Sequence, residues 1–186
     1  MVYYLWWLVV QYNNKNPKIF ILSGKAKSGK NLMADIIEKY YSDKKCIQLS
    51  YAYYLKQYVK KITNWDGSEE NKPRDLLQSL GIDLLKKIDQ NLLIRRVIED
   101  IKVYSYFYDV IIVTDARLIE EIEEPKKIFN CITIRINKNS NNLTEEQRKH
   151  ITETNLDDYQ NFDYVVENKD IEDLKKQIIN ILKEVS

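Results

Sequence analysis

The chain has 186 residues, a formal net charge of +1 and 31 % charged residues. This length fits one domain with a full hydrophobic core, and the near-neutral charge argues against a nucleic-acid or membrane partner. Its two cysteines, Cys46 and Cys131, have no C-x-x-C or metal-ligand spacing. We therefore expect reduced thiols in buried strands of a cytoplasmic protein.

Residues 1–17 are expected to form an extension and linker ahead of a single domain at 18–186. The apolar run Tyr3–Val10 is too short to span a bilayer and lacks the basic region and cleavage site of a signal peptide. An added edge strand, a partner contact and a miscalled start codon all fit this run. Asn13–Pro17 has the composition of a linker.

A glycine-rich loop follows the first predicted strand, Lys18–Ser23. It reads G-x-x-x-x-G-K and leads into a helical pattern that extends to about Tyr41. A strand, such a loop and a helix in this order are typical of a phosphate-binding loop, whose backbone N–H groups and helix N-terminus attract anions. The alternative is a tight turn that happens to contain glycines and lysines. The candidate phosphate-binding residues are Gly24, Lys25, Ala26, Lys27, Ser28, Gly29 and Lys30.

Lys30 is placed to neutralise the outer phosphates of a nucleoside triphosphate. The next residue is Asn31, where a serine or threonine normally holds Mg²⁺. An amide oxygen can also reach a metal ion or its water, so Asn31 stays a candidate metal ligand.

The middle of the chain predicts a second strand at Cys46–Ser50 and then helices over about 51–104. A strand after a helix of this length indicates a βαβ unit and a parallel sheet. One helix covers Tyr54–Ile62, with Leu55, Tyr58, Val59 and Ile62 on its apolar side. Pro73 opens the next helix, and Asn91–Tyr104 forms another. The apolar residues expected in the core of the Pro73 helix are Leu76, Leu77, Leu80, Leu84, Leu85 and Ile88.

Asp109–Thr114 is a continuous β-branched run, typical of the centre of a parallel sheet. It ends in Asp115 and Arg117. Ligands of such sheets lie at the carboxyl ends of the strands, so both residues should emerge beside the glycine-rich loop. Asp115 would then hold hydrated Mg²⁺ or an acceptor hydroxyl, and Arg117 a phosphate. The alternative is a helix-capping aspartate and a surface arginine.

A helix near Leu118–Glu124 should end at Pro125, followed by a strand at Cys131–Ile136. The polar segment of about 137–154 is either a lid over a triphosphate or a solvated helix. A last strand at Phe162–Val166 and a helix at Ile171–Lys183 complete the chain. The predicted fold class is α/β, with three layers, a central parallel sheet and flanking helices, as in P-loop NTPases.

Several segments in this order resemble the P-loop deoxynucleoside monophosphate kinases of phage and bacterial type. The resemblance runs from residue 18 to the C-terminus. The segments that carry it are Ile21–Lys30, Lys72–Gly81 (K-P-R-D-L-L-Q-S-L-G), Val113–Arg117 (V-T-D-A-R), His150–Glu153 (H-I-T-E) with Leu156-Asp157, and Phe162–Asn168.

The resemblance implies ATP-dependent phosphoryl transfer to a (deoxy)nucleoside monophosphate, with Mg²⁺. The implied catalytic residues are Lys30, Asp115, Arg117 and Arg148, with Arg135 as a second candidate for transition-state charge. The loop residues, Asn31 and Asn168 would bind ATP. The implied acceptor-binding residues are Arg74, Gln78, Asp115, Arg117, His150 and Glu153, and the implied metal ligands are Asn31 and Asp115. Small-molecule nucleotides would be the partners, and a homodimer is compatible with the family.

The chain departs from the family pattern at a few positions. Ala116 replaces Val, Leu118-Ile119 replaces an aromatic-Pro pair, and Thr152 replaces Ser. Two other functions therefore stay open. One is a kinase for another small acceptor, similar to phosphomevalonate or dephospho-coenzyme A kinase. The other is a non-catalytic nucleotide-binding protein.

Overall fold

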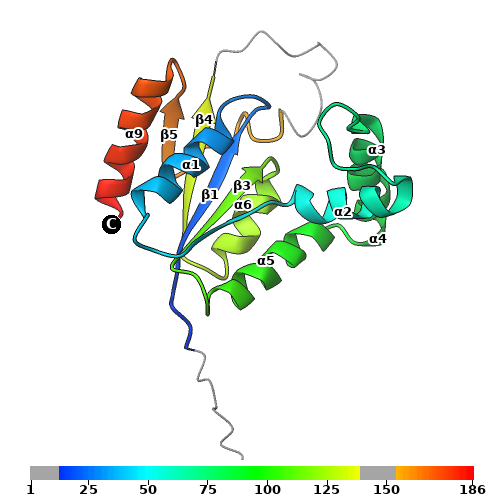
Figure 1. The fold of residues 1–186 in the computed structure, drawn as a ribbon, viewed down its shortest axis with the longest axis horizontal. Helices are drawn as coiled ribbons and strands as arrows, with labels where there is room; N and C mark the ends of the chain where they lie inside the picture. The colour runs from blue at the N-terminus through cyan, green and yellow to red at the C-terminus, as the bar shows by residue number, and fades with distance from the viewer. Residues whose placement is uncertain (1–12, 139–153) are drawn as a thin grey trace, which may run out of the picture.

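A computed structural model describes residues 13–138 and 154–186 of the chain. Its centre is a five-stranded sheet in the order β2-β3-β1-β4-β5, and all four neighbouring pairs are parallel (Figure 1). Every strand therefore ends at the same edge of the sheet, as the sequence predicted. The strands are β1 Lys18–Gly24, β2 Cys46–Leu49, β3 Val110–Ala116, β4 Cys131–Asn137 and β5 Tyr164–Glu167.

Helices cover both faces of the sheet. The face with α1 and α9 encloses one apolar cluster, and the face with α5 and α6 encloses another. In Figure 1, α1 crosses in front of β1, α9 lies to the left of the strands, and α5 lies below and to the right of them. The predicted three-layer α/β class is confirmed. The four helices are α1 Lys30–Tyr40, α5 Leu92–Tyr104, α6 Ile119–Lys126 and α9 Ile171–Glu184.

The central strand β1 is buried on both faces because its side chains alternate between the two clusters. Phe20 and Leu22 belong to the α1 and α9 side, whereas Ile19 and Ile21 belong to the α5 and α6 side. Full burial of one such side chain contributes about 1.5–3 kcal/mol. This explains the unbroken apolar run in the sequence and places the end of β1, with its loop, at the middle of the sheet edge.

The helices between β2 and α5 form a lobe beside the sheet. They are α2 Ala52–Thr63, α3 Arg74–Ser79, the π-helix η1 Leu80–Leu85 and α4 Lys86–Ile88. Their own apolar cluster is centred on Val59, Leu80 and Leu85. In Figure 1 the lobe lies to the right of the strands.

The sequence placed too many apolar residues in the core of this lobe. Leu84 is 50 % exposed and Ile88 is 64 % exposed, and Ile62 on α2 is also exposed. The prediction assumed a 3.6-residue period throughout. In the π-helical segment Leu80–Leu85, backbone hydrogen bonds join residues five apart instead of four apart. This rotates the side chains that follow away from the predicted face. Pro73 also differs, because it precedes the first helical residue rather than occupying it.

Pro125 does not end its helix, contrary to the prediction. It lies inside α6, which continues to Lys126. A proline in a helix leaves the carbonyl four residues earlier without its N–H partner, here the carbonyl of Glu121. The hydroxyl of Tyr51 donates to that carbonyl at 2.5 Å and so replaces the missing bond.

The predicted bounds of the terminal elements are correct to within a few residues. β5 begins at Tyr164, two residues after the predicted start, because Asp163 pairs with Thr133 through its side chain at 2.7 Å and 2.6 Å. In the predicted linker, Lys15 forms an ion pair with Asp109 at 3.0 Å. Within the described residues, no helix is long and apolar enough to cross a bilayer.

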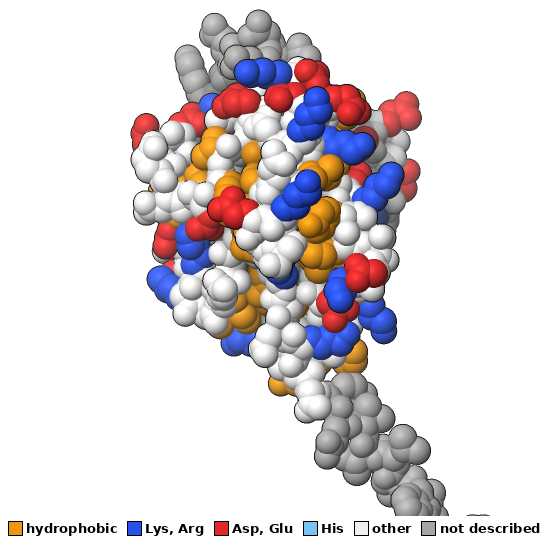
Figure 2. All heavy atoms as spheres, turned by 90° about the vertical axis from the view of Figure 1, so that its left-hand side faces the viewer, with side chains coloured by type: hydrophobic (Ala, Val, Ile, Leu, Met, Phe, Trp, Pro, Cys, Tyr) orange, Lys and Arg blue, Asp and Glu red, His pale blue; other side chains and the backbone are white. Residues whose placement is uncertain are grey.

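The α9 face carries acidic and basic side chains that alternate over its surface (Figure 2).

Both thiols are free, but only Cys131 is buried, since Cys46 lies in the edge strand β2. Burial raises the pKa of Cys131 to about 12, so this thiol is inert at neutral pH. The apolar run of residues 3–10 and most of the predicted lid, with Arg148, His150 and Glu153, lie outside the described residues.

Candidate nucleotide-binding site

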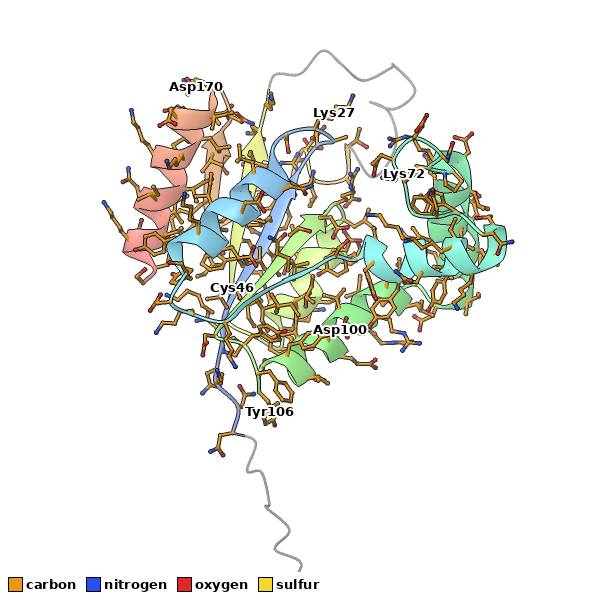
Figure 3. All side chains as sticks on the ribbon, in the orientation of Figure 1. Lys27, Cys46, Lys72, Asp100, Tyr106 and Asp170 are labelled. Atoms are coloured by element: carbon orange, nitrogen blue, oxygen red, sulfur yellow. The ribbon has the colours of Figure 1, made fainter. Side chains whose placement is uncertain are left out.

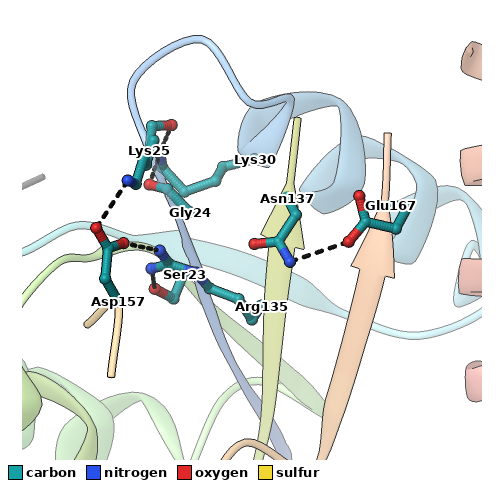
Figure 4. A network of polar contacts seen from close by, with 8 residues as sticks. All are labelled: Ser23, Gly24, Lys25, Lys30, Arg135, Asn137, Asp157 and Glu167. Carbon is teal, nitrogen blue, oxygen red and sulfur yellow. Dashed lines mark hydrogen bonds and ion pairs between the residues drawn. The ribbon is translucent and has the colours of Figure 1, made fainter. Parts of the chain in front are cut away.

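The glycine-rich loop joins the end of β1 to the start of α1 (Figure 4). A Cβ atom on Gly24 would lie 2.5 Å from the Ile136 side chain and 2.6 Å from its carbonyl oxygen. Gly29 has a φ of 110° and a Cβ there would lie 2.7 Å from the Asn168 amide nitrogen. Both positions therefore exclude a side chain, which explains why the loop uses two of the chain's four glycines.

The Lys30 ammonium lies inside this loop. It donates to the carbonyl oxygens of Gly24 at 2.6 Å and Lys25 at 2.8 Å, and the residue is only 8 % exposed. The backbone thus folds around a positive charge at the first turn of α1. That first turn contains no acidic residue, so the partial positive charge of the helix N-terminus is not offset there.

Asn168 supports the loop from the turn after β5. Its side-chain amide donates to the Ser28 carbonyl oxygen at 2.6 Å, and its own N–H donates to the Asn137 carbonyl at 2.7 Å. Among the described residues, the buried Ser28 hydroxyl has no hydrogen-bond partner. Asn168 is thus brought to the predicted cofactor-binding loop, where it shapes the loop through the backbone of Ser28.

A polar network that sequence reasoning did not assign connects this loop to the segment after the predicted lid. Asp157 lies 2.8 Å from the Lys25 ammonium and 3.3 Å from the Arg135 guanidinium (Figure 4). Arg135 also donates to the buried hydroxyl of Ser23 at 3.0 Å. The only signal for Asp157 in the sequence is the Leu156-Asp157 pair, which is part of the family resemblance but predicts no role for the carboxylate.

The network borders an open pocket at the ends of β4 and β5, with a volume of roughly 430 Å³. Polar side chains on its wall come from the loop, both strands and the segment after the predicted lid. They include Lys25, Arg135, Asn137, Asp157 and Glu167.

Asp115, at the end of β3, caps a helix that is distant in sequence. Its Oδ1 accepts the N–H of Tyr51 at 2.8 Å, and its Oδ2 accepts the Ser50 hydroxyl at 2.7 Å and the N–H of Ala52 at 3.1 Å. The helix-capping alternative is therefore correct in kind, but the helix is α2 and not the one that follows β3. Three donors leave one lone-pair position of the carboxylate for a substrate or metal-bound water.

The backbone at Arg117 is held by Glu121, another residue that the sequence analysis missed. The Glu121 carboxylate accepts the N–H of Arg117 at 2.6 Å and that of Leu118 at 3.0 Å. Burial, as the largest effect, and the charge of Asp115 raise the pKa of Glu121 to about 7, although its two backbone bonds and Arg117 oppose the shift. A capping glutamate three residues after Leu118 gives no recognisable pattern, because leucine is not a capping residue.

The predicted acceptor residues on α3 are exposed. Arg74 forms an ion pair with Glu69 at 3.1 Å, and Gln78 is on the surface of the same helix. In Figure 3, Lys27 of the loop and Lys72, just ahead of Arg74, both lie toward the upper edge of the molecule. Arg74 and Gln78 therefore belong to the lobe, whereas the loop, Asp115 and Arg117 belong to the sheet edge.

The donor set fits a Mg²⁺ ion that is held mainly by phosphates. Such ions take one or two protein oxygens and keep several waters. Asn31 is exposed on the first turn of α1 and offers an amide oxygen, and Asp115 offers its remaining lone pair. No group of three or more acidic, histidine or cysteine side chains forms a metal cage within the described parts of the chain.

The fold is similar to that of several solved kinase structures. The structure matches an APS kinase from Mycobacterium tuberculosis in complex with AMPPNP and APS, with a TM-score of 0.51, 13 % identity and coverage of 90 % of this chain and 98 % of that one. It matches shikimate kinase from Aquifex aeolicus with a TM-score of 0.52, 16 % identity and coverage of 90 % and 97 %. A sugar kinase from Janibacter sp. HTCC2649 matches with a TM-score of 0.56 and 10 % identity, and the match covers 90 % of this chain and 93 % of that one. At these identities the matches show a shared P-loop kinase fold.

Comparison with curated protein sequences gives no match. The model of one family, deoxynucleotide monophosphate kinase, matches residues 51–178. This range includes the lobe with Arg74, the end of β3 and the support residue Asn168, and it covers more than half of the chain. The chain belongs to the deoxynucleotide monophosphate kinase family.

Proposed function

We propose that this kinase transfers the γ-phosphoryl group of ATP to a deoxynucleoside monophosphate and forms the diphosphate. The observation that carries the proposal is the Lys30 ammonium, enclosed by the loop carbonyls at the N-terminus of α1. Lys30 lies at the sheet edge where β3 ends, with Asp115 in the strand and Arg117 directly after it. Membership of the deoxynucleotide monophosphate kinase family supports this choice of acceptor.

The donor side of the site consists of the loop and its supports. Its backbone N–H groups, Lys30 and Lys25 would bind the β- and γ-phosphates of ATP. The Asn168 amide bond to the Ser28 carbonyl and the tight fit at both glycines hold the loop in one shape. The APS kinase neighbour, which was solved with AMPPNP, agrees with ATP as the donor.

The acceptor side would use Arg117 at the sheet edge and Arg74 on the lobe. Guanidinium groups bind phosphate oxygens in a bidentate manner, and two of them would hold the acceptor phosphate in line with the donor. Arg74 is ion-paired with the exposed Glu69, a weak pair that an acceptor phosphate would displace. Asp115 would orient the attacking oxygen or a metal-bound water.

Phosphoryl transfer asks the protein for positioning and for positive charge rather than for covalent chemistry. When bound, Mg²⁺ would neutralise part of the charge on the donor phosphates. Lys30 and Arg117 would add positive charge around the transferred group, and Arg135, which Asp157 and Ser23 hold at the same edge, would add more. Arg148 of the predicted lid remains a further candidate for this role.

An acceptor panel tests the proposal. The full chain is incubated with ATP and Mg²⁺ and with dAMP, dGMP, dCMP or dTMP in turn, and ADP release is measured. We expect turnover with at least one of the four. Parallel reactions with phosphomevalonate and dephospho-coenzyme A test the other small acceptors. Measurable ATP binding without turnover on any acceptor would favour the non-catalytic alternative, for which Asn31 and Ala116 are the motivating departures.

A further inference from the structure

Tyr51 and Glu121 form a buried pair beneath the end of β3. They are 2 % and 9 % exposed. The hydroxyl of Tyr51 donates to the backbone carbonyl of Glu121 at 2.5 Å. This carbonyl is free to accept because Pro125, four residues later, has no N–H group to offer it. Burial raises the pKa of Tyr51 well above its usual value, so the hydroxyl remains a donor at all relevant pH values.

Each member of the pair also holds one of the two sheet-edge residues of the proposed site. The N–H of Tyr51 donates to Asp115 at 2.8 Å. The Glu121 carboxylate accepts the N–H of Arg117 at 2.6 Å and the N–H of Leu118 at 3.0 Å. The carboxylate of Asp115 and the backbone of Arg117 are thus each held by one member of a buried contact between the N-terminus of α2 and α6.

We propose that Tyr51 and Glu121 are positioning residues that set the placement of Asp115 and Arg117 for the acceptor phosphate. The inference rests on the proposed function, since it assigns these two residues to the acceptor. A carboxylate that accepts two N–H groups fixes the backbone more firmly than a neutral acceptor, because charged hydrogen bonds are about twice as strong. Small displacements of a phosphate-binding group cost large factors in rate.

If Glu121 only capped α6, it would serve the fold alone. The free-energy cost of burying its charge argues against that role. Burying an ionised carboxylate costs free energy that a neutral acceptor at the same place does not require. The groups that face Glu121 are Asp115, Arg117 and Tyr51. The charge of Asp115 opposes ionisation of Glu121, and only Arg117 and the two N–H groups favour it. The ionised form is therefore stabilised only by the segment that carries Arg117 and Leu118.

The experiment compares the wild-type full chain with Glu121→Gln, with the near-isosteric Tyr51→Phe, and with Glu120→Gln as a control on the same helix. The probe is whichever of dAMP, dGMP, dCMP and dTMP the wild type turns over fastest. For Glu121→Gln we expect the KM of this acceptor to rise about tenfold at pH 8, with the KM of ATP changed less than twofold. The wild-type acceptor KM should also rise as the pH falls from 8 to 6, and this dependence should be lost in Glu121→Gln.

Tyr51→Phe should raise the acceptor KM about threefold or more and should leave the pH dependence in place, since it removes only the hydroxyl. Glu120→Gln should match the wild type. An unchanged acceptor KM in both variants, with the wild type active, would overturn this inference and leave the proposed function standing. Absence of wild-type turnover with all four acceptors would overturn the proposed function and this inference with it.

Discussion

The Asp157 carboxylate lies 2.8 Å from the Lys25 ammonium, although 132 residues separate them in the chain. This contact joins the first lysine of the phosphate-binding loop to the segment that follows the predicted lid. Both side chains are about two-fifths exposed, so the pair contributes little to stability, on the order of 0.2–1 kcal/mol. Its consequence is electrostatic, because Asp157 supplies negative charge where the triphosphate would bind.

Replacing Asp157 with asparagine should therefore strengthen ATP binding. The substitution keeps the size of the side chain and leaves Lys25 and Arg135 without their shared counter-charge. We expect the KM of ATP to fall about two- to fivefold at low salt, the range of an exposed pair, and the difference to shrink at high salt. Asp158→Asn is the matched control. A higher KM in Asp157→Asn would mean instead that Asp157 orients the two cations.

Lys30→Ala should nearly abolish turnover. The variant removes the one ammonium that the loop carbonyls enclose, and loss of such a preorganised charge costs about 10²–10³ in kcat. Circular dichroism and the thermal midpoint should show a folded protein. Lys39→Ala, in the last turn of the same helix, serves as the control. A near-full rate in Lys30→Ala would exclude the loop from catalysis.

Arg74→Ala should act on the acceptor and not on ATP. Arg74 is exposed on α3, and its Glu69 partner forms only a weak surface pair, so folding should be unaffected. We expect the acceptor KM to rise about tenfold or more, because a bidentate phosphate contact is lost. Steady-state kinetics with each substrate varied in turn give the answer. Arg95→Ala, which removes an arginine from α5, is the comparison, and equal effects of the two variants would remove Arg74 from the site.

Gly29→Ala should destabilise the fold and impair ATP binding together. The φ of 110° is unfavourable for a residue with a Cβ atom, and that atom would lie 2.7 Å from the Asn168 amide that supports the loop. We expect the free energy of unfolding to fall by about 1–2 kcal/mol. Denaturant titration measures the loss. Gly81→Ala is the control, since Gly81 is helical and a Cβ atom there would contact only the end of the Leu55 side chain, at 3.1 Å. If Gly81→Ala lowered the free energy of unfolding as much as Gly29→Ala, the φ of Gly29 would not be the cause.

The buried Glu121 carboxyl should impose a pH dependence on stability. Its pKa in the folded protein is about 7, above the ordinary value of 4.5, so between these values the folded state binds a proton that the unfolded state has released. The free energy of unfolding should therefore fall as the pH rises from 4.5 toward 7, by at most about 1.4 kcal/mol per pH unit for one proton. Denaturant titrations at several pH values should show that Glu121→Gln loses this part of the slope. An identical slope in both proteins would mean that Glu121 ionises normally.

The elements that local chemistry specifies could be predicted from the sequence. The unbroken apolar runs of β1 and β3, the glycine pattern of the loop and the alternation of strands with helices all act over a few neighbouring residues. They were sufficient for the parallel sheet, for the position of the loop and for the emergence of Asp115 and Arg117 at the same edge. The two errors within elements have different causes. The π-helical turn at Leu80–Leu85 changed the helical period locally, whereas Pro125 is accommodated in α6 by the hydrogen bond between Tyr51 and Glu121, which lie 70 residues apart in the chain.

Only the tertiary structure decided which side chains complete the site. Asp115 caps a helix whose first residues lie more than sixty positions earlier, and Asp157 reaches Lys25 across most of the chain. The Glu121 carboxylate accepts the N–H of Arg117 at the start of α6, where the sequence contains no recognisable capping pattern. A sequence pattern reports the preferences of neighbouring residues, whereas the contacts of Asp115 and Asp157 arise when the fold brings distant segments to one edge of the sheet. The loop and Lys30 could therefore be predicted from the sequence, but Asp157 and Glu121, which contact the loop and the segment after β3, could not.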